Sequence, residues 1–439
     1  MSQIFKHMNI KKIIRDTLTI KFDKAFGLDI GDRSMEVIEL EKVFRFSVST
    51  YGRTELPAGV VENGKVVNQA VLAEKLKKLL KEVKPKRVST NKVILSLPES
   101  QIYSECFTVD AKLKSGALSQ AIINQVSLSL PLNIDKTYWD FTEKTLPDKT
   151  KKMIMFMAVP KDVANSYVKF CNSVGLEVVS LCLESLSLAR VILRNSDRQS
   201  LIMDIGAGST NLCFYDSNDM VNMAVTLPVA GAQMTEAISN KLKLETADAE
   251  ALKAKFGFKD GKDNVVRPVI LPVMADILSE TKEAIEYYEL TFKQKLDDIY
   301  IIGGSALLPG LAEEIKSSLK REVQIASGGY NVDLKSFVGK NNSFPLYVNV
   351  IGLGMLGASG EFQDMNLLKK MPTAEVNSVS RLNLFNLGYL SRVNTVRTII
   401  NNKYILAILI ILIAVIFAVL YQQAQNYGFA SVSSGPLNL

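Results

Sequence analysis

Two segments far apart in this chain share one pattern, and that pattern strongly limits how the chain can fold. Residues 26–40 read FGLDIGDRSMEVIEL, and residues 201–216 read LIMDIGAGSTNLCFYD. In each, a short apolar run reaches Asp-Ile-Gly, passes through small or polar residues, and continues into a second strand-type run. A glycine-containing turn between two such runs is typical of a β-hairpin. We therefore expect two similar half-domains that face each other.

A third segment has the features of a ligand-binding turn. Residues 299–316, IYIIGGSALLPGLAEEIK, begin with a strand of buried type that runs into a Gly-Gly-Ser turn at 303–305. Glycine lets the backbone approach a ligand closely, and proline suits a first helical turn, so a helix is expected to begin near Pro309. Apolar residues at helical spacing predict a preceding helix at roughly 275–296.

The chain between the two hairpins alternates strand and helix patterns. Residues 92–110 are predicted to form a pair of strands around a turn, and residues 153–159 a buried strand. Residues 117–129 and 161–174 are predicted to form helices. This alternation is typical of an α/β architecture.

Composition excludes several function classes. A chain of 439 residues, 47% of them hydrophobic, can bury a sizeable core, and its length suggests roughly two or three domains. A net charge of +7 is too modest for a dedicated nucleic-acid binder. His7 is the single histidine and no cysteines form a CxxC pair, so neither an ordinary zinc site nor a Ser/His/Asp hydrolase can be assembled. We expect reduced, mostly buried cysteines at Cys106, Cys171, Cys182 and Cys213.

Residues 404–421, YILAILIILIAVIFAVLY, are uniformly apolar, and no charged residue follows Tyr404. A run of about 18 apolar residues can cross a hydrocarbon core of ~30 Å, so we expect a transmembrane helix. The basic residues nearest to it all precede it, and the positive-inside rule therefore places residues 1–403 in the cytoplasm. We expect a single-pass protein of the cytoplasmic membrane, with residues 422–439 as a short disordered tail outside. The flanking basic residues are Arg381, Arg392, Arg397 and Lys403.

Residues 1–24 mix basic and apolar residues without the long apolar core of a signal peptide. Their spacing predicts a short amphipathic basic helix. Such a helix either packs on its own domain or lies on an anionic membrane surface, and the sequence leaves both open.

The order of hairpin, hairpin, helix and Gly-Gly-Ser turn resembles that of the superfamily of actin, sugar kinases and heat-shock chaperone ATPases. Within it the chain is similar to the PilM family, the actin-like proteins of type IV pilus assembly, over about residues 25–360. This resemblance implies an α/β, actin-like (ribonuclease H-like) fold with two half-domains around a nucleotide cleft, the second at roughly 198–345. The strings that carry it are SLPES at 96–100, AVPKDVANSYVKFCNSVGLEVVSLCLESLSLAR at 158–190, LPVAGAQMTEAI at 227–238 and VNVIGLGMLG at 348–357.

The resemblance implies that the cleft binds ATP and Mg²⁺. Asp29 and Asp204 stand where carboxylates hold the metal, often through its waters, because carboxylates repel phosphates directly. Asp204 and Glu184 are the implied catalytic residues, with Glu184 near the place of an attacking water. Glu280 and Lys282 match positions that contact adenosine, and the turns would offer N–H groups and hydroxyls to the phosphates and ribose. The implied nucleotide-binding residues are Asp29, Gly31, Ser34, Gly206, Ala207, Gly208, Ser209, Thr210, Glu280, Lys282, Gly303, Gly304 and Ser305.

One residue departs from the family pattern. Many relatives end the first hairpin with a lysine that reaches the terminal phosphates, and the matching residue here is Glu36. A carboxylate there would repel an anion unless it faces away or shares the metal. We therefore expect at most a slow ATPase, in which the nucleotide acts as a conformational switch.

The segment after the actin-like region resembles a partner protein of the family. DMNLLKKMP at 364–372 is similar to the N-terminal peptide of PilN, and LNLFNLGYL at 382–390 is a second candidate. In PilN such a peptide precedes a basic stretch and a transmembrane helix, the order found here within 361–421. The chain thus resembles a PilM body fused to a PilN-like anchor, and the peptide could bind its own subunit, a neighbour or a separate protein.

These features favour a membrane-anchored assembly scaffold of a type IV pilus or related secretion platform. Its expected partners are the PilN-like peptide, other platform proteins and the membrane, but no nucleic acid, with homo-oligomerisation left open. One alternative is a sugar or metabolite kinase, for which we identify no substrate-side carboxylate base. Another is a cell-division protein similar to FtsA, which would bind the membrane through an amphipathic helix, whereas residues 404–421 are uniformly apolar.

Overall fold

The computed structural model describes residues 24–371 except 43–44, 130–132, 147, 194–196, 329–331, 335–342 and 361–365. The chain divides into two compact units, Met1–Ser378 and Val379–Leu439, and all described residues belong to the first. Within this described part, no helix is long and apolar enough to cross a membrane. Five predicted segments lie outside the described residues. They are 1–24, of which only residue 24 is described, and 381–403, 382–390, 404–421 and 422–439.

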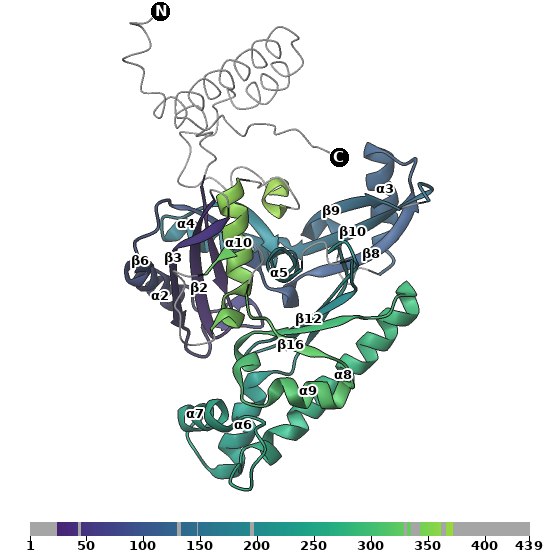
Figure 1. The fold of residues 1–439 in the computed structure, drawn as a ribbon. Coiled ribbons are helices and arrows are strands. Elements are labelled where there is room, and N and C mark those ends of the chain that lie inside the picture. The colour runs from purple at the N-terminus through teal and green to yellow at the C-terminus, as the bar shows by residue number, and fades with distance from the viewer. Residues whose placement is uncertain are drawn as a thin grey trace, which may run out of the picture. The chain divides into compact units, whose positions relative to one another are not determined.

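The first Asp-Ile-Gly segment forms the predicted hairpin, at the centre of a seven-stranded sheet (Figure 1). The second strand of the hairpin pairs antiparallel with the first, which also pairs parallel with β7. The strand order is β11 (Glu177–Leu183), β7 (Lys92–Leu97), β1 (Phe26–Ile30), β2 (Ser34–Lys42), β3 (Phe46–Glu55) and β17 (Val332–Asp333), with β6 (Lys84–Pro85) also paired to β3.

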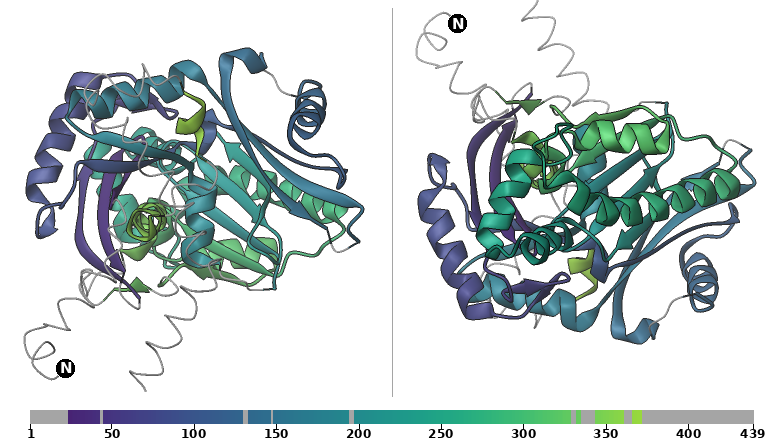
Figure 2. Two further views of the ribbon diagram at one scale, coloured as in Figure 1. Left: turned by 90° about the horizontal axis from the view of Figure 1, so that it is seen from above. Right: turned by 90° about the horizontal axis from the view of Figure 1, so that it is seen from below.

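Helices cover both faces of this sheet, as Figure 2 shows from above and below. α5 (Glu184–Ile192) and α10 (Val348–Ser359) pack together on one face, over β1 and β2. α2 (Gln69–Glu82) and α4 (Lys161–Ser173) cover the opposite face. The sheet is therefore buried on both sides, which fits the largely apolar sequences of β1 and β7.

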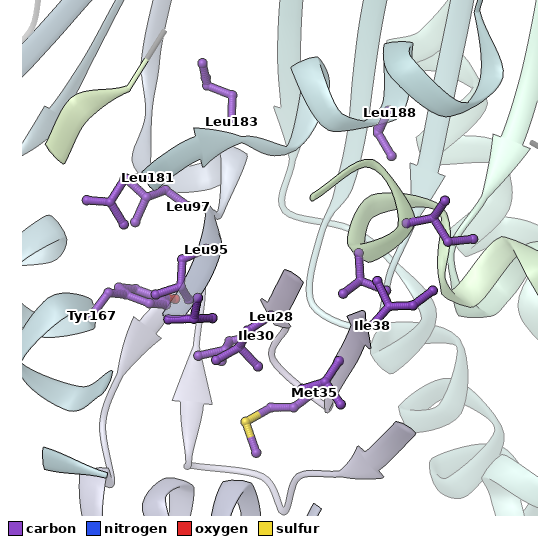
Figure 3. Packing of buried hydrophobic residues seen from close by; sticks show 14 of the residues in the cluster. Leu28, Ile30, Met35, Ile38, Leu95, Leu97, Tyr167, Leu181, Leu183 and Leu188 are labelled. Atoms are coloured by element: carbon purple, nitrogen blue, oxygen red, sulfur yellow. The ribbon is translucent and has the colours of Figure 1, made fainter. Parts of the chain in front are cut away.

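The alternation of side chains along β1 places the first aspartate. Leu28 and Ile30 point into the core, where they meet Leu95 and Leu97 of β7 and Tyr167 of α4 (Figure 3). Successive side chains of a strand point to opposite faces, so Asp29 faces away from this core. The same apolar residues that bury the strand thus direct a carboxylate to the other face.

The second Asp-Ile-Gly segment forms the second predicted hairpin, in a five-stranded sheet. One face of this sheet packs around a second core, and the other face contributes to the core of the first half. The strand order is β14 (Val221–Leu227), β13 (Thr210–Tyr215), β12 (Ser200–Ile205), β15 (Asp298–Ile302) and β16 (Val323–Ile325). The helices of this half are α6 (Gly231–Leu242), α7 (Thr246–Phe256), α8 (Arg267–Phe292) and α9 (Leu311–Leu319). α8 begins earlier than predicted, and a 3₁₀ turn, η4 (Gly304–Leu307), precedes α9.

Residues 92–110 form two strands around a turn, as predicted, but the two strands join different sheets. β7 belongs to the seven-stranded sheet, whereas β8 (Tyr103–Asp110) is an edge of a separate three-stranded sheet. The 3₁₀ turn η2 (Glu99–Gln101) separates the two strands. β7 is buried along nearly its whole length, as a central strand should be, while β8 is only half-buried. The small sheet is completed by β10 (Lys151–Pro160), β9 (Thr137–Thr145) and the helix α3 (Ser115–Val126).

Candidate functional site

A cavity of about 190 Å³ lies where the turns of both hairpins meet the Gly-Gly-Ser turn. The first half contributes residues 29–34 to its lining and the second contributes 206–209 and 303–304. Asn349, at the start of α10, closes one side. Three segments that are distant in sequence therefore line one space, as the repeated pattern predicts.

Asp29 is held by a chain of hydrogen bonds. Asn349 Nδ2 donates to Ser96 Oγ (3.0 Å), and Ser96 Oγ donates to Asp29 Oδ1 (2.9 Å). Burial raises the pKa of Asp29, while hydrogen bonds from Ser96, Asn349 and Ile30 act against this shift. These hydrogen bonds fix the orientation of Asp29, but ionising its carboxyl group without a nearby cation costs free energy.

Asp204 is the second-last residue of β12, beside the Gly-Gly-Ser turn. Burial, and then the charge of Asp29, raises its pKa to about 7. Gly303 has a φ of +84°, and a Cβ at this position would lie 2.3 Å from Asp204 Oδ1. Only glycine allows the turn to pass this close to the carboxylate.

Two further carboxyl groups lie behind these aspartates. Glu184 begins α5, accepts a hydrogen bond from Asn211 Nδ2 at Oε2 (3.3 Å), and has a pKa raised well above its usual range by burial and by Asp29, Glu99 and Asp204. Burial likewise raises the pKa of Glu99 to about 7. The cavity therefore gathers carboxyl groups that favour the neutral form unless a cation joins them.

Glu36 faces the cavity rather than pointing away from it. It forms an ion pair with Arg53 of β3, whose Nε donates to Glu36 Oε1 at 2.8 Å. Burial, and then the charge of Asp29, raises the pKa of Glu36 to about 8, while Arg53 acts against this shift. Glu36 is thus paired with a cation from the next strand.

Asp32 is a cavity residue that the sequence did not single out. Its Oδ1 accepts a hydrogen bond from the Gly64 amide at 3.0 Å. A Cβ at Gly208 would lie 2.1 Å from Asp32 Oδ2, so the turn of the first hairpin lies against the turn of the second. The sequence signal that could have found it is an aspartate directly after Asp-Ile-Gly. An aspartate in a turn, however, usually only hydrogen-bonds the backbone of that turn.

The structure brings together most of the predicted site residues. Thr210 and Ser305 lie just behind the cavity, where Thr210 Oγ1 donates to Val229 O (2.7 Å) and Ser305 Oγ donates to Gly206 O (3.4 Å). Glu280 and Lys282 are not brought there: they lie midway along α8, exposed, and do not line the cavity. The predicted residues that line it are Asp29, Gly31, Ser34, Glu184, Asp204, Gly206, Ala207, Gly208, Ser209, Gly303 and Gly304.

A buried lysine on α7 that the sequence did not single out lies near these turns. Lys253, only 5% exposed, donates from Nζ to Gly231 O (2.9 Å) and Thr235 Oγ1 (2.7 Å), and Glu250 Oε2 lies 2.7 Å from the same Nζ. Gly231 in turn contacts the second hairpin, because its amide donates to Gly206 O at 3.1 Å. Lys253 and Glu250 were missed because their helix has no marked apolar face that would single it out.

A second candidate site lies between β9 and β11, and residues 366–371 of the same chain occupy it (yellow-green in Figure 2). Asn366 is 3% exposed and bridges the two sheets. Its side-chain amide accepts a hydrogen bond from Leu181 N at Oδ1 (3.0 Å) and donates one from Nδ2 to Val179 O (3.2 Å). Its backbone N–H donates to Asp140 Oδ2 (3.3 Å). Leu367 beside it is fully buried. The described part of the predicted peptide 364–372 thus binds in cis to the free edge of β11.

Three kinds of similarity bear on the identity of this fold. The profile of the family described as "Type IV pilus assembly protein PilM" matches residues 27–356. A solved chain of the "PilM-PilN type IV pilus biogenesis complex" superposes with a TM-score of 0.67 at 22% identity, covering 76% of this chain and 98% of that chain. The described residues therefore have the actin-like ATPase fold expected from the sequence.

The chain is also similar to cell-division proteins. It is 21% identical to FtsA of Bacillus subtilis (strain 168), over 50% of this chain and 53% of that protein. It is 26% identical to FtsA of Streptococcus pneumoniae serotype 2, over 50% of each. The chain thus spans about half the length of the curated relatives it matches.

Proposed function

The chain belongs to the type IV pilus assembly protein PilM family, and on that premise we propose that it is a membrane-anchored, ATP-binding scaffold of a type IV pilus or related secretion platform. ATP would act as a conformational switch for peptide binding, with slow hydrolysis at most. The observation that carries this proposal is the delivery of Asp29 and Asp204, from two half-domains, to one cavity.

The residues of the cavity fit ATP and Mg²⁺. Glycines and hydroxyl residues of both hairpin turns line a space with two carboxyl groups whose raised pKa values a bound cation would lower. No group of three His, Cys, Asp or Glu side chains suited to a metal exists in the described part of the chain, so phosphate oxygens would have to complete the coordination. The bound metal would neutralise phosphate charge, and Asp29 and Asp204 would hold it.

A switch needs two parts that can move against each other. One face of the five-stranded sheet packs around a core of its own, its other face contributes to the core of the seven-stranded sheet, and the cavity is lined from both sheets. A nucleotide that contacts both turns would stabilise the conformation in which the turns lie together. The size of this effect equals the difference in its binding free energy between that conformation and one in which the turns are apart.

Residues 366–371 support the partner assignment. They resemble the PilN peptide, and the similar solved structure is described as a PilM-PilN complex. We assign the space between β9 and β11 to this peptide, supplied here by the same chain and open to exchange with a neighbour's copy. Residues 404–421, by their length and basic flank, would anchor the chain in the cytoplasmic membrane with its bulk in the cytoplasm.

Calorimetry on the full-length chain in mild detergent tests the nucleotide assignment. ATP should bind in the presence of Mg²⁺, binding should weaken at least tenfold with excess EDTA, and steady-state hydrolysis should stay well below the usual enzymatic range of about 1 per second or more. Absence of ATP binding with Mg²⁺ would remove Asp29 and Asp204 from that role. Turnover at tens per second would instead replace the switch with an enzyme.

A further inference from the structure

We propose that Arg53, positioned by Glu36, is the residue that binds the terminal phosphates of the nucleotide. This inference deepens the proposed function and rests on it. The ligand class is a nucleoside di- or triphosphate, because a guanidinium at this place would meet the anionic end of the ligand rather than its base.

The geometry rests on one row of side chains across three strands. Asp29 of β1 lies directly opposite Glu36 of β2, and Glu36 lies directly opposite Arg53 of β3. Directly opposed residues point to the same face, with Cβ atoms about 5 Å apart. Asp29, Glu36 and Arg53 all line the cavity, so the row runs along its wall. Arg53 is therefore two strands from the aspartate proposed to hold the metal.

The charge of the cavity makes a cation there necessary for binding an anion. Of the described residues that line it, six are acidic and two, Arg33 and Arg53, are basic. Arg33 lies exposed at the tip of the first hairpin turn. Arg53 is held against a side chain that is only 4% exposed, while its own side chain is 30% exposed. Arg53 is thus the basic residue with a fixed orientation and access to the cavity.

The chemistry of arginine suits this role. Glu36 engages the Nε–H, and the second carboxylate near the guanidinium, Glu55, lies 3.8 Å from Nη1 and is 86% exposed, which makes it a weak competitor. The Nη groups retain N–H donors that match phosphate oxygens in paired hydrogen bonds. Glu36 therefore limits the freedom of the side chain, and less entropy is lost when phosphate binds.

Arg53→Met in the full-length chain tests the inference by calorimetry with ATP, ADP and AMP in Mg²⁺. We expect affinity for ATP and ADP to fall at least tenfold, and affinity for AMP to change less than threefold. Arg321→Met is the matched control, because Arg321 forms a similar ion pair with Glu289 (2.9 Å; 33% and 24% exposed) in the other half. Equal affinity of Arg53→Met and the unchanged chain for ATP would overturn the inference.

Two double variants separate phosphate binding from simple neutralisation of Glu36. Glu36→Gln with Arg53→Met removes both charges, and it should regain thermal stability but not ATP affinity. Glu36→Lys with Arg53→Met moves the cation one strand closer to Asp29, and it should recover most of the affinity. Full ATP affinity in the charge-free variant would overturn the inference. An unchanged chain that binds no ATP would instead overturn the proposed function, and this inference with it.

Discussion

Gly303 shows how much one residue constrains the cavity. Its φ of +84° with ψ of 179° belongs to a region that is essentially restricted to glycine, and a Cβ would lie 2.3 Å from Asp204 Oδ1. We expect Gly303→Ala to destabilise the fold by about 1–3 kcal/mol and to weaken ATP binding by displacing Asp204. Thermal unfolding and calorimetry measure both effects.

Gly304→Ala is the matched control for that change. A Cβ at Gly304 would have Leu346 Cδ2 as its nearest neighbour, at 3.9 Å, an ordinary van der Waals contact. This variant should unfold at the same temperature as the unchanged chain, and because Gly304 itself lines the cavity, the comparison concerns stability alone. Equal effects at the two positions would show that the approach to Asp204 is not the cause.

Glu99 makes the free energy of unfolding depend on pH, because its buried environment raises its pKa. Burial raises its pKa from 4.5 to about 7, and neither of its carboxyl oxygens has a hydrogen-bond partner among the described residues. The folded chain thus holds the proton more tightly than the unfolded chain, so this residue lowers stability progressively as pH rises from about 4.5 to about 7. The loss is at most about 3 kcal/mol.

We therefore expect Glu99→Gln to raise the thermal unfolding temperature at pH 8 and to leave it nearly unchanged at pH 4.5. Glu62→Gln, at an exposed carboxylate, serves as the control and should have no effect at either pH. A stabilisation by Glu99→Gln of the same size at both pH values would contradict the role of its proton.

At the scale of elements, β11 connects the two candidate sites. Its free edge binds Asn366 through Val179 and Leu181, and the strand continues directly into α5, whose first residue is Glu184. The side-chain amide of Asn366 forms hydrogen bonds with backbone groups of this edge strand that would otherwise bond to water. The peptide and the cavity therefore share one structural element.

Asn366→Ala should release the docked segment. It leaves Leu181 N and Val179 O without the side-chain amide, a loss of about 1–3 kcal/mol for buried groups. We expect hydrogen exchange to accelerate in residues 366–371 and at the Leu181 amide. A synthetic peptide of residues 361–390 should also bind at least tenfold more tightly, because the competing segment in cis is weakened.

Lys369→Ala, at an exposed position of the same segment, is the control and should leave exchange at Leu181 unchanged. Unaltered exchange in Asn366→Ala would show that the asparagine does not hold the segment. Unchanged peptide affinity would show that the segment and the peptide do not compete.

For the molecule as a whole, a ligand between the two half-domains should raise the stability of both. At 100 times the dissociation constant, ATP with Mg²⁺ is expected to add about 2.7 kcal/mol to the free energy of unfolding. Excess EDTA should abolish most of this gain. Asp204→Asn should abolish it too, whereas Asp263→Asn, on an exposed loop, should not. A full gain in the presence of EDTA would argue against the metal.

Much of the fold could be predicted because its main signals are local. Each hairpin is specified by a few neighbouring residues: an apolar run, a glycine-containing turn and a second strand. The repeat of that pattern, with the Gly-Gly-Ser turn, located most of the cavity lining. The same local patterns located both strands within residues 92–110, but they carry no signal for which sheet each strand joins.

The sequence by itself determined which residues could carry the chemistry: the two aspartates, the glycine-containing turns and the Asn-Leu-Leu segment. Only the tertiary structure decided how they are used. The pairing of Glu36 with Arg53 depends on the register of β2 and β3. Glu280 and Lys282 stay out of the cavity because they lie on the exposed side of α8. The docking of Asn366 depends on the edge of the sheet that β11 forms. Each of these joins residues that are distant in the chain, and such contacts form only when whole elements pack, whereas turns and strands form from neighbours.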